Sequence, residues 1–214
     1  MKKGIITLLG LVLLFALAGC GNTAAPAGAE EKTPQTAAQT QTASQTAAAV
    51  RHAEITVRDY GTIKLELDAA AAPITVENFV KLVESGFYDG LTFHRIMDGF
   101  MIQGGDPEGT GSGGADKTIK GEFSQNGVDN PISHVKGVIS MARSGDPNSA
   151  SSQFFICVGD AGFLDGSYAA FGWTEDEESL EIALQIAKDA KPVDNNGSIP
   201  KGEQPVIESI KVVE

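Results

Sequence analysis

The chain has 214 residues, of which 42% are hydrophobic and 25 are glycine. This length and composition favour one good-sized, turn-rich folded domain with appendages over a disordered chain. The formal net charge of -12 disfavours a phosphate-binding surface, so nucleic acid is excluded as an expected partner.

The first segment, residues 1–19, has the features of a secretory signal peptide. A basic start at residues 1–3 is followed by an apolar stretch at residues 4–18 and by small residues up to Cys20. This apolar stretch is shorter than the roughly 20 residues that a membrane-spanning helix needs. We therefore expect a targeting signal here rather than a spanning helix.

Residues 17–20, Leu-Ala-Gly-Cys, resemble the lipobox of bacterial lipoproteins. The resemblance implies that Cys20 becomes the lipidated first residue of the mature protein and attaches it to a lipid bilayer. Cys157 is the second of two cysteines, so no internal disulfide is expected once Cys20 is lipidated. Because Cys157 lies in an apolar run, a buried inert thiol is favoured over a nucleophile.

Residues 20–51 are expected to form a linker behind the lipidated cysteine. They consist almost wholly of Ala, Thr, Gln, Pro, Gly and Ser, which cannot build a hydrophobic core. An Ala-rich helix is the alternative, but the prolines and the many threonines disfavour it. We expect a flexible spacer that holds a folded domain, residues 52–214, away from the lipid surface.

From His52 onward, short alternating apolar runs are separated by Gly, Asp, Asn and Pro, a pattern typical of strands. The expected strands are residues 53–57, 62–67, 91–97, 100–104, 138–142, 153–158 and 206–213. Two further stretches have helical periodicity. Their expected apolar stripes are Val76, Phe79, Val80 and Val83 in residues 74–85, and Leu180, Leu184 and Ala187 in residues 178–190.

Many strands without an alternating βαβ order favour a closed antiparallel β-barrel with two helices packed on it. Within residues 93–106, an extended strand would place Phe93 and Arg95 on one face, and Met101 and Gln103 would share a face beyond a turn. A third strand would place Gln153 and Phe155 together, with Phe154, Ile156 and Val158 on the opposite face.

Polar groups among aromatic and thioether side chains indicate a groove for a partly apolar ligand that needs a few hydrogen bonds. Considered alone, Arg95 would more simply form an ordinary surface ion pair. The motifs around it change this interpretation. Phe93-His94-Arg95 with residues 99–106 resembles the signature of the cyclophilin-type peptidyl-prolyl cis-trans isomerases, joined in the family's order and spacing by residues 137–142, 152–156 and 164–166.

The resemblance runs from about residue 53 to residue 214. It implies a mainly β fold, a closed eight-stranded antiparallel barrel capped by two α-helices, and activity as a monomer without cofactor or metal. Arg95 would be the catalytic cation. The proline ring would contact Phe100, Met101, Phe155, Leu164, Phe163 and Tyr168, and the substrate backbone would be bound by Gln103, Gly111, Ala142, Arg143 and Gln153.

The sequence departs from the family pattern at three of these positions. Phe163 stands where animal cyclophilins commonly carry Trp, Tyr168 stands where they commonly carry His, and Arg143 stands where an Asn is common. The resemblance implies that catalysis survives the changes at Phe163 and Tyr168. The change at Arg143 should cost little, because the family uses that position mainly through its main chain.

Other motifs give weaker predictions. Residues 109–114 match a dinucleotide-binding G-x-G-x-x-G, with Asp129 about 20 residues later, but no helix is expected after them and Asp129 begins a turn signal. A flexible loop beside the groove is favoured. The three histidines have no metal-ligand spacing and are expected to have structural or surface roles, with His94 pointing away from Arg95. They are His52, His94 and His134.

The sequence therefore predicts a lipid-anchored isomerase at the extracytoplasmic face of the cell membrane, acting on proline-containing unfolded or exported polypeptides. One alternative is a tethered peptide-binding chaperone that uses the same groove with little catalytic turnover. A second alternative is a scaffold protein of the envelope.

Overall fold

The computed structural model describes residues 50–213, so the expected signal peptide, Cys20 and nearly all of the linker lie outside the described residues. Within this part of the chain, no helix is both long enough and apolar enough to cross a membrane. The elements are β1 (Val50–Val57), β2 (Gly61–Asp68), α2 (Pro73–Glu84), β3 (Phe93–Met97), β4 (Met101–Gly104), η1 (Ser124–Asn126), β5 (Val138–Met141), β6 (Phe154–Cys157), η2 (Gly162–Leu164), β7 (Ala170–Thr174), α3 (Glu177–Asp189) and β8 (Ile207–Val213).

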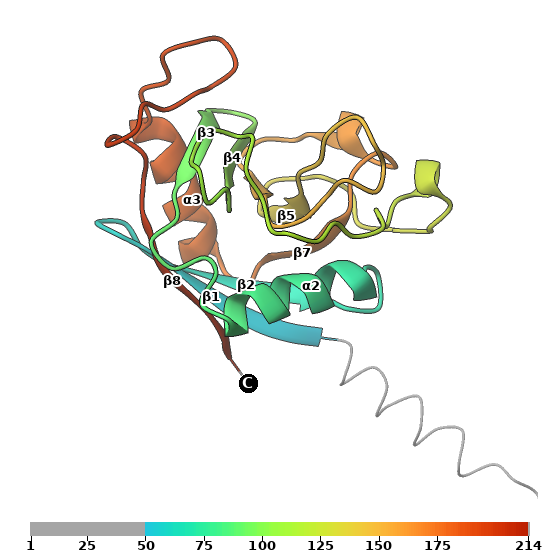
Figure 1. Cartoon of the computed structure of the whole chain (residues 1–214). Helices are drawn as coiled ribbons and strands as arrows, with labels where there is room; N and C mark the ends of the chain where they lie inside the picture. Colours follow the sequence, from blue (N-terminus) through green and yellow to red (C-terminus); the bar gives the residue numbers. More distant parts are fainter. Residues whose placement is uncertain (1–49, 214) are drawn as a thin grey trace, which may run out of the picture. The chain divides into compact units, whose positions relative to one another are not determined.

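All eight strands belong to one antiparallel sheet with the order β3-β4-β6-β5-β7-β2-β1-β8. The sheet curls into a half-barrel, with α2 and α3 packed against it (Figure 1). The two ends of the sheet approach each other at an isolated bridge between Thr92 and Val206, not at a ladder between β3 and β8. The mainly β fold with eight antiparallel strands and two helices is thus confirmed. The strand pairing does not show the fully closed barrel that was expected.

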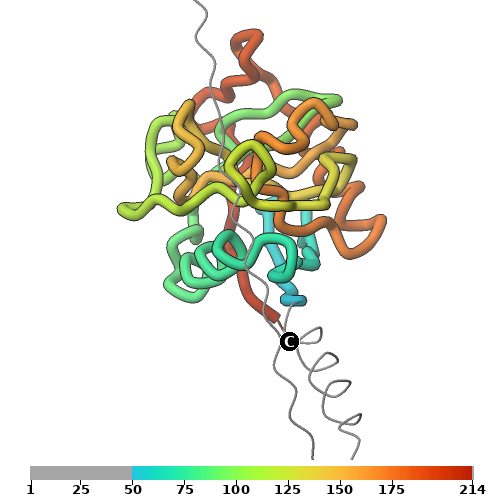
Figure 2. The backbone as a smooth tube through the Cα atoms, turned by 90° about the vertical axis from the view of Figure 1, so that its right-hand side faces the viewer, coloured from blue at the N-terminus to red at the C-terminus, as the bar shows by residue number. Residues whose placement is uncertain are grey.

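The first hairpin shows why the alternating runs form strands. In β1 and β2 every second residue is buried, and Ile55 lies opposite Ile63 in the register. Asp59 in the turn between the strands and Gly61 at the start of β2 both have positive φ, which Gly adopts without steric cost. β8 pairs with the other edge of β1, so the start of β1 and the end of β8 lie at the same end of the molecule (Figure 2).

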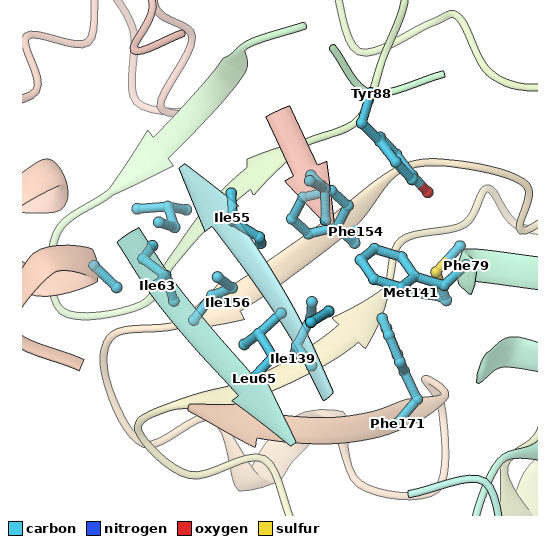
Figure 3. Close-up of a cluster of buried hydrophobic side chains, with 14 of the residues drawn as sticks. Ile55, Ile63, Leu65, Phe79, Tyr88, Ile139, Met141, Phe154, Ile156 and Phe171 are labelled. Atoms are coloured by element: carbon cyan, nitrogen blue, oxygen red, sulfur yellow. The ribbon is translucent and has the colours of Figure 1, made fainter. Parts of the chain in front are cut away.

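The core lies between the concave face of the sheet and α2 (Figure 3). Aromatic rings dominate it: Phe154 of β6 is in edge-to-face contact with Phe79 of α2, at a centroid distance of 5.7 Å, and with Tyr88, at 5.6 Å. Such pairs contribute about 0.5 to 1.5 kcal/mol each beyond the area that they bury. Aliphatic residues of β1, β2, β5 and β6 fill the rest of the interior.

The helix predictions hold in position and differ in detail. The apolar stripe expected on α2 is buried as predicted, but α3 buries Ser179, Ala183, Ile186 and Ala187, leaving Leu180 and Leu184 only half-buried. Small side chains let α3 lie close to β2, where the Ser179 hydroxyl accepts a hydrogen bond from the Lys64 amide at 2.9 Å. A prediction from hydrophobicity alone therefore assigned the wrong residues to the buried face of α3, because it missed the small side chains that pack there.

The prediction that Phe93 and Arg95 share a face is wrong. Phe93 pairs with Gly104 and Arg95 pairs with Gln103, so β3 has one extra residue, His94, between two residues that pair with neighbours on β4. This bulge at His94 turns the next side chains over. Phe93 consequently packs in the core, whereas Arg95 faces the opposite side of the sheet together with Gln103.

β7 was not among the strands expected from the sequence. Its residues, Ala-Phe-Gly-Trp-Thr, include Gly172, and Gly weakens a strand prediction. The structure shows why this glycine is there, because a Cβ at Gly172 would collide with the Glu66 carbonyl of β2. β6, in contrast, has the predicted two faces, with Phe154 and Ile156 in the core and Phe155 on the other side.

A buried carboxylate holds the start of α2. Ala72, the N-cap residue, has no side chain that could accept a hydrogen bond from the first turn. Glu122, which is only 2% exposed, accepts instead from the Ile74 amide at 3.1 Å, the Thr75 amide at 2.8 Å and the Thr75 hydroxyl at 2.7 Å. These bonds satisfy amide groups that a helix leaves unpaired at its N-terminus.

We expect Glu122→Ala to lower the free energy of unfolding by about 3 kcal/mol, because it leaves buried donors without acceptors. Chemical denaturation of the full chain measures this loss. The matched control is Glu77→Ala on the exposed face of α2, where loss of the Lys81 pair is expected to cost about 0.5 kcal/mol or less. Equal losses in the two variants would contradict the capping role of Glu122.

Candidate active site

A groove of about 460 Å³ lies on the side of β3, β4 and β6 that faces away from the main core. Its floor is a second, smaller apolar cluster that contains Met101, Phe155 and Leu164, all almost fully buried. The groove brings together ten of the residues expected from the sequence: Arg95, Phe100, Met101, Gln103, Gly111, Ala142, Arg143, Phe155, Leu164 and Tyr168.

Two expected residues lie just outside this lining. Gln153 lines an adjoining cavity of about 350 Å³, which shares Gln103, Ala142 and Arg143 with the groove. Phe163 is 72% exposed on η2, and its ring centroid lies 5.5 Å from that of Phe100. Phe163 therefore extends the aromatic wall beyond the groove and does not form part of its floor.

The strand register sets the order of the groove side chains. Arg95 on β3 lies opposite Gln103 on β4, which in turn lies opposite Phe155 on β6. One row across three strands therefore carries a cation, an amide and an aromatic ring. Because strands are rigid elements, these three groups keep their spacing without help from a ligand.

The guanidinium of Arg95 is half-buried and held at two of its nitrogens. Its Nε donates to the Asn196 carbonyl at 2.7 Å, and its Nη1 donates to the Gln103 Oε1 at 3.1 Å. The remaining acceptors near Nη1 and Nη2 are the thioether sulfurs of Met101, at 3.9 Å, and Met97, at 3.3 Å. Thioethers are weak acceptors, so these N–H groups are available to a bound ligand.

A chain of side-chain amides connects Arg95 to the glycine-rich loop. The Gln103 Nε2 donates to the Gln153 Oε1 at 2.9 Å, and the Gln153 Nε2 donates to the Gly113 carbonyl at 2.7 Å and the Gly111 carbonyl at 3.1 Å. Each amide therefore uses its oxygen toward Arg95 and its nitrogen toward the loop. This orients both glutamines before any ligand arrives.

Asp106, which is 1% exposed, organises the loop itself. Its carboxylate accepts from the amides of Glu108 at 2.8 Å, Thr110 at 2.9 Å and Gly111. Burial alone would raise the pKa of Asp106, but the hydrogen bonds from these backbone amides and from Gly113 outweigh it and keep this pKa below its ordinary value. The G-x-G-x-x-G match is thus a loop beside the groove, as its sequence context indicated, and the hydrogen bonds to Asp106 that organise it were not foreseen.

His94 lines the same groove as Arg95, so the prediction that it points away is wrong, and the bulge at this position is the reason. It is 4% exposed, and neither of its ring nitrogens has a hydrogen-bond partner among the described residues. Burial lowers the pKa of His94, and the nearby Arg95 acts in the same direction while Asp106 opposes it. The imidazole is therefore neutral at pH 7.

Arg143 braces the far wall of the groove through its side chain. Its guanidinium carbon lies 4.7 Å from the ring centroid of Tyr168 and 5.1 Å from that of Phe123. The Nε donates to the Ser167 carbonyl at 2.9 Å and Nη1 donates to the Ser144 carbonyl at 2.8 Å. The sequence analysis expected this position to act mainly through its main chain, but the side chain also contacts the ring of Tyr168.

A row of hydrogen-bonded polar groups lies beneath Phe155, with His134 and Ser140 buried and Asp165 exposed at its outer end. The His134 Nδ1 is 2.8 Å from the Asp165 Oδ1, its Nε2 is 3.0 Å from the Ser140 Oγ, and its ring is stacked with that of Phe155 at 6.0 Å. Such a row could suggest a hydrolase, but Ser140 is fully buried and cannot reach a substrate. The row supports the groove floor from below.

Two other sequence expectations concern metals and thiols. Among residues 50–213 there is no group of three or more His, Cys, Asp or Glu side chains that could hold a metal ion. Cys157 is buried, as predicted, and burial raises its pKa to about 12. A thiol with this pKa is protonated at neutral pH and is inert as a nucleophile.

The sequence analysis missed part of the lining. The segment after α3 contributes Asn196, Ser198 and Ile199, although about a hundred residues separate it from Arg95. Asn196-Gly197 is a recognisable turn signal. No signal in the sequence, however, indicates where that turn lies. The other lining residues that were not expected are His94, Gly109, Thr110 and Ser112.

Comparisons with known proteins identify the family of this chain. The family model described as cyclophilin type peptidyl-prolyl cis-trans isomerase/CLD matches residues 52–212. A peptidyl-prolyl cis-trans isomerase of Synechococcus elongatus is 52% identical over 126 residues, which cover 59% of this chain and 82% of that protein. Peptidyl-prolyl cis-trans isomerase B of Bacillus subtilis is 47% identical over 145 residues, covering 68% of this chain and 91% of that protein.

Among solved structures, a cyclophilin type peptidyl-prolyl cis-trans isomerase of Cryptosporidium parvum, crystallised in the presence of the dipeptide Ala-Pro, matches with a TM-score of 0.64 and 31% identity. The match covers 76% of this chain and 99% of that one. Because the family model matches residues 52–212 and the fold matches that of solved members, the chain belongs to the cyclophilin-type peptidyl-prolyl cis-trans isomerases.

Proposed function

We propose that this isomerase accelerates the folding of exported polypeptides, that Arg95 is its catalytic group, and that a lipidated Cys20 holds it at the outer face of the cell membrane. Isomerase activity follows from the family. The observation that supports the role of Arg95 is its placement: a half-buried guanidinium, fixed by Asn196 and Gln103, beside an apolar floor.

The reaction needs no covalent chemistry. Rotation about the X-Pro bond breaks amide resonance and crosses a barrier of about 18 to 20 kcal/mol. When the bond is twisted, the prolyl nitrogen regains its lone pair and becomes a hydrogen-bond acceptor. A donor aimed at this nitrogen therefore interacts more strongly with the transition state than with the ground state, and this difference accelerates the reaction.

Arg95 suits this role because its charge and direction are both fixed. A guanidinium is not deprotonated in proteins, and its planar fork offers several parallel donors. With Nε held by Asn196 and part of Nη1 held by Gln103, the edge next to the thioethers of Met97 and Met101 is left for the substrate. A twisted imide nitrogen is a better acceptor than either sulfur.

The apolar floor accounts for proline selectivity. Met101, Phe155 and Leu164 form a surface that fits a saturated five-membered ring, and Phe100 and Tyr168 flank it. If the ring stays in this pocket, the preceding carbonyl is the part that rotates. The relative crystallised in the presence of Ala-Pro supports a proline-containing ligand for this groove.

The competing hypothesis is a tethered chaperone that uses the same groove to bind peptides without turnover. Both functions need the apolar floor, but only catalysis needs the guanidinium next to it. The full set of fixed hydrogen bonds around Arg95 favours catalysis, because binding alone gains little from a precisely oriented cation.

We expect Arg95→Ala to lower kcat/KM by about 100-fold, the usual cost of removing a transition-state donor. Arg95→Lys should recover part of the rate, since an ammonium keeps the charge but lacks the fork. A protease-coupled assay on a proline tetrapeptide measures both. Arg58→Ala, which removes an exposed arginine paired with Glu208, is the matched control and should keep the full rate. Equal rates for wild type and Arg95→Ala would leave only the chaperone hypothesis.

We also expect kcat/KM to stay constant between pH 7 and pH 9. Burial lowers the pKa of His94, so this group is already neutral at pH 7 and stays neutral as the pH rises. Burial also lowers the pKa of Arg95, with Tyr168 and Asp194 opposing it, but the guanidinium keeps its charge throughout this range. A bell-shaped profile in the same assay would indicate general acid–base catalysis and contradict the mechanism.

The membrane location rests on the first 51 residues of the sequence. The basic start, the apolar stretch and the Leu-Ala-Gly-Cys motif support export and lipidation of Cys20, and the Ala/Thr/Gln-rich linker would let the domain reach clients away from the surface. Clients would then be proline-containing chains that emerge unfolded from the export machinery.

In a bacterial host, we expect metabolic labelling with palmitate to mark the wild-type chain and to place it in the membrane fraction. Cys20→Ser should lose both the label and the membrane association, because the thiol is the acceptor of the lipid. Cys157→Ser is the control and should keep both. Labelling that persists in Cys20→Ser would show that the anchor is elsewhere.

A further inference from the structure

We propose that Asp194 is a positioning residue for catalysis: its carboxylate shapes the segment after α3 so that the Asn196 carbonyl holds the Nε of Arg95. This inference rests on the catalytic role proposed for Arg95. Asp194 forms no hydrogen bond or ion pair with Arg95 among the described residues. It binds the backbone amides of the groove-lining residues Asn196 and Ser198 and acts through the backbone of residues 194–198, here called the clamp loop.

The clamp loop makes the shortest hydrogen bond to Arg95. The Asn196 carbonyl accepts from Nε at 2.7 Å, compared with 3.1 Å for the bond from Nη1 to Gln103. A bond at Nε fixes the plane and the direction of the guanidinium, since Nε is the atom closest to the flexible stem. Without it, the Nη groups could rotate away from the position that the prolyl nitrogen occupies.

Asp194 determines the shape of this loop. Its Oδ1 accepts from the Asn196 amide at 3.0 Å and from the Ser198 amide at 2.9 Å, while its carbonyl accepts from the Gly197 amide at 3.2 Å. One carboxylate oxygen therefore gathers the amides on both sides of Gly197. Hydrogen bonds from Ser198, and then from Asn196 and Gly197, lower the pKa of Asp194 despite the opposing effect of desolvation.

The clamp loop and the residue that follows it, Ile199, are hydrogen-bonded to β3 on both sides of Arg95. The Ile96 amide donates to the Gly197 carbonyl at 2.8 Å, and the Ile199 amide donates to the His94 carbonyl at 2.9 Å. Gly197 has a φ of +87°, and a Cβ there would lie 2.6 Å from the Ile96 carbonyl. The turn thus follows β3 closely, and in Figure 2 the red segment after α3 lies beside the green strand segment.

A neutral carbonyl is a better clamp for this cation than a carboxylate would be. Among the described residues, Arg95 has no ion pair. A directly paired carboxylate would compete with the substrate for the Nη donors. Asp194 avoids this by binding backbone amides, and it still attracts the guanidinium from a distance. Asp194 therefore orients the Arg95 guanidinium through the clamp loop and also supplies a nearby negative charge, while the Nη donors of Arg95 stay free for the substrate.

Removal of the Asp194 carboxylate should weaken the hydrogen bond between the Asn196 carbonyl and the Arg95 Nε but leave the apolar floor of the groove unchanged. We expect Asp194→Ala to lower kcat by about tenfold, because small misplacements of a catalytic group have large effects on rate. KM for the tetrapeptide should change less than about twofold, since the apolar floor is intact. Asp194→Asn should keep most of the rate, because its amide oxygen can accept from the same two backbone amides.

A second measurement reports on the clamp directly. The chain has four arginines, Arg51, Arg58, Arg95 and Arg143, so their four Nε–Hε signals can be assigned by NMR. In the wild-type chain the Arg95 signal should exchange slowly with water. In Asp194→Ala it should exchange at least about fivefold faster, since hydrogen-bonded protons exchange only when the bond opens, and in Asp194→Asn it should remain slow.

The matched control is Asp68→Ala, which removes a carboxylate that accepts from the Ala70 amide at 2.9 Å and the Ala71 amide at 3.0 Å, in a turn before α2 that lines no part of the groove. It should change neither kcat nor the Arg95 signal.

Wild-type kcat or slow Arg95 exchange in Asp194→Ala overturns the inference, and so does an equal loss of kcat in Asp68→Ala. If Arg95→Ala instead keeps the wild-type rate, the proposed catalytic role of Arg95 is wrong. The exchange rate of the Arg95 Nε–Hε proton in Asp194→Ala then still tests separately whether Asp194 holds the guanidinium in place.

Discussion

The structure depends on presenting one half-buried cation that is held in place but not neutralised. Arg95 is bound by a backbone carbonyl and a side-chain amide, and no carboxylate pairs with it among the described residues. Burial strengthens the field of such a charge and also makes it costly, so the hydrogen bonds from Nε and Nη1 compensate for lost water. This balance keeps the guanidinium charged and leaves donors for the proposed interaction with a prolyl nitrogen, which becomes an acceptor only in the transition state.

The curled sheet makes this arrangement possible because one of its faces packs into the hydrophobic core and the other carries the groove. β6 illustrates the division, because Phe154 packs against Phe79 and Tyr88 in the core while Phe155 forms the groove floor on the other side. The bulge at His94 performs the same task on β3, turning Arg95 outward immediately after the buried Phe93. The rigid core thus fixes the spacing of the groove side chains, and the loops supply the remaining contacts.

Sequence patterns predicted what depends on neighbouring residues and failed where distant segments meet. Alternation identified both faces of β6, and helical periodicity identified the buried stripe of α2, because each follows from local geometry. The bulge at His94 was missed because its only mark is the odd spacing of the buried residues Phe93 and Ile96, which a run as short as β3 does not make recognisable. β7 was missed because Gly172 is required by the close approach of β2, a tertiary contact. The clamp loop was missed for the same kind of reason, since its turn signal says nothing about its position beside β3.

Because no bond to the enzyme is made or broken, the rate enhancement has to come from groups that are already in place. The amide chain from Gln103 through Gln153 to Gly111, the brace of Arg143 on Tyr168 and the carbonyl of Asn196 all meet this condition through internal hydrogen bonds or ring contacts. A groove assembled in this way does not need to close around its client. It can therefore act on a proline within a long unfolded chain, which is the kind of substrate proposed for this enzyme.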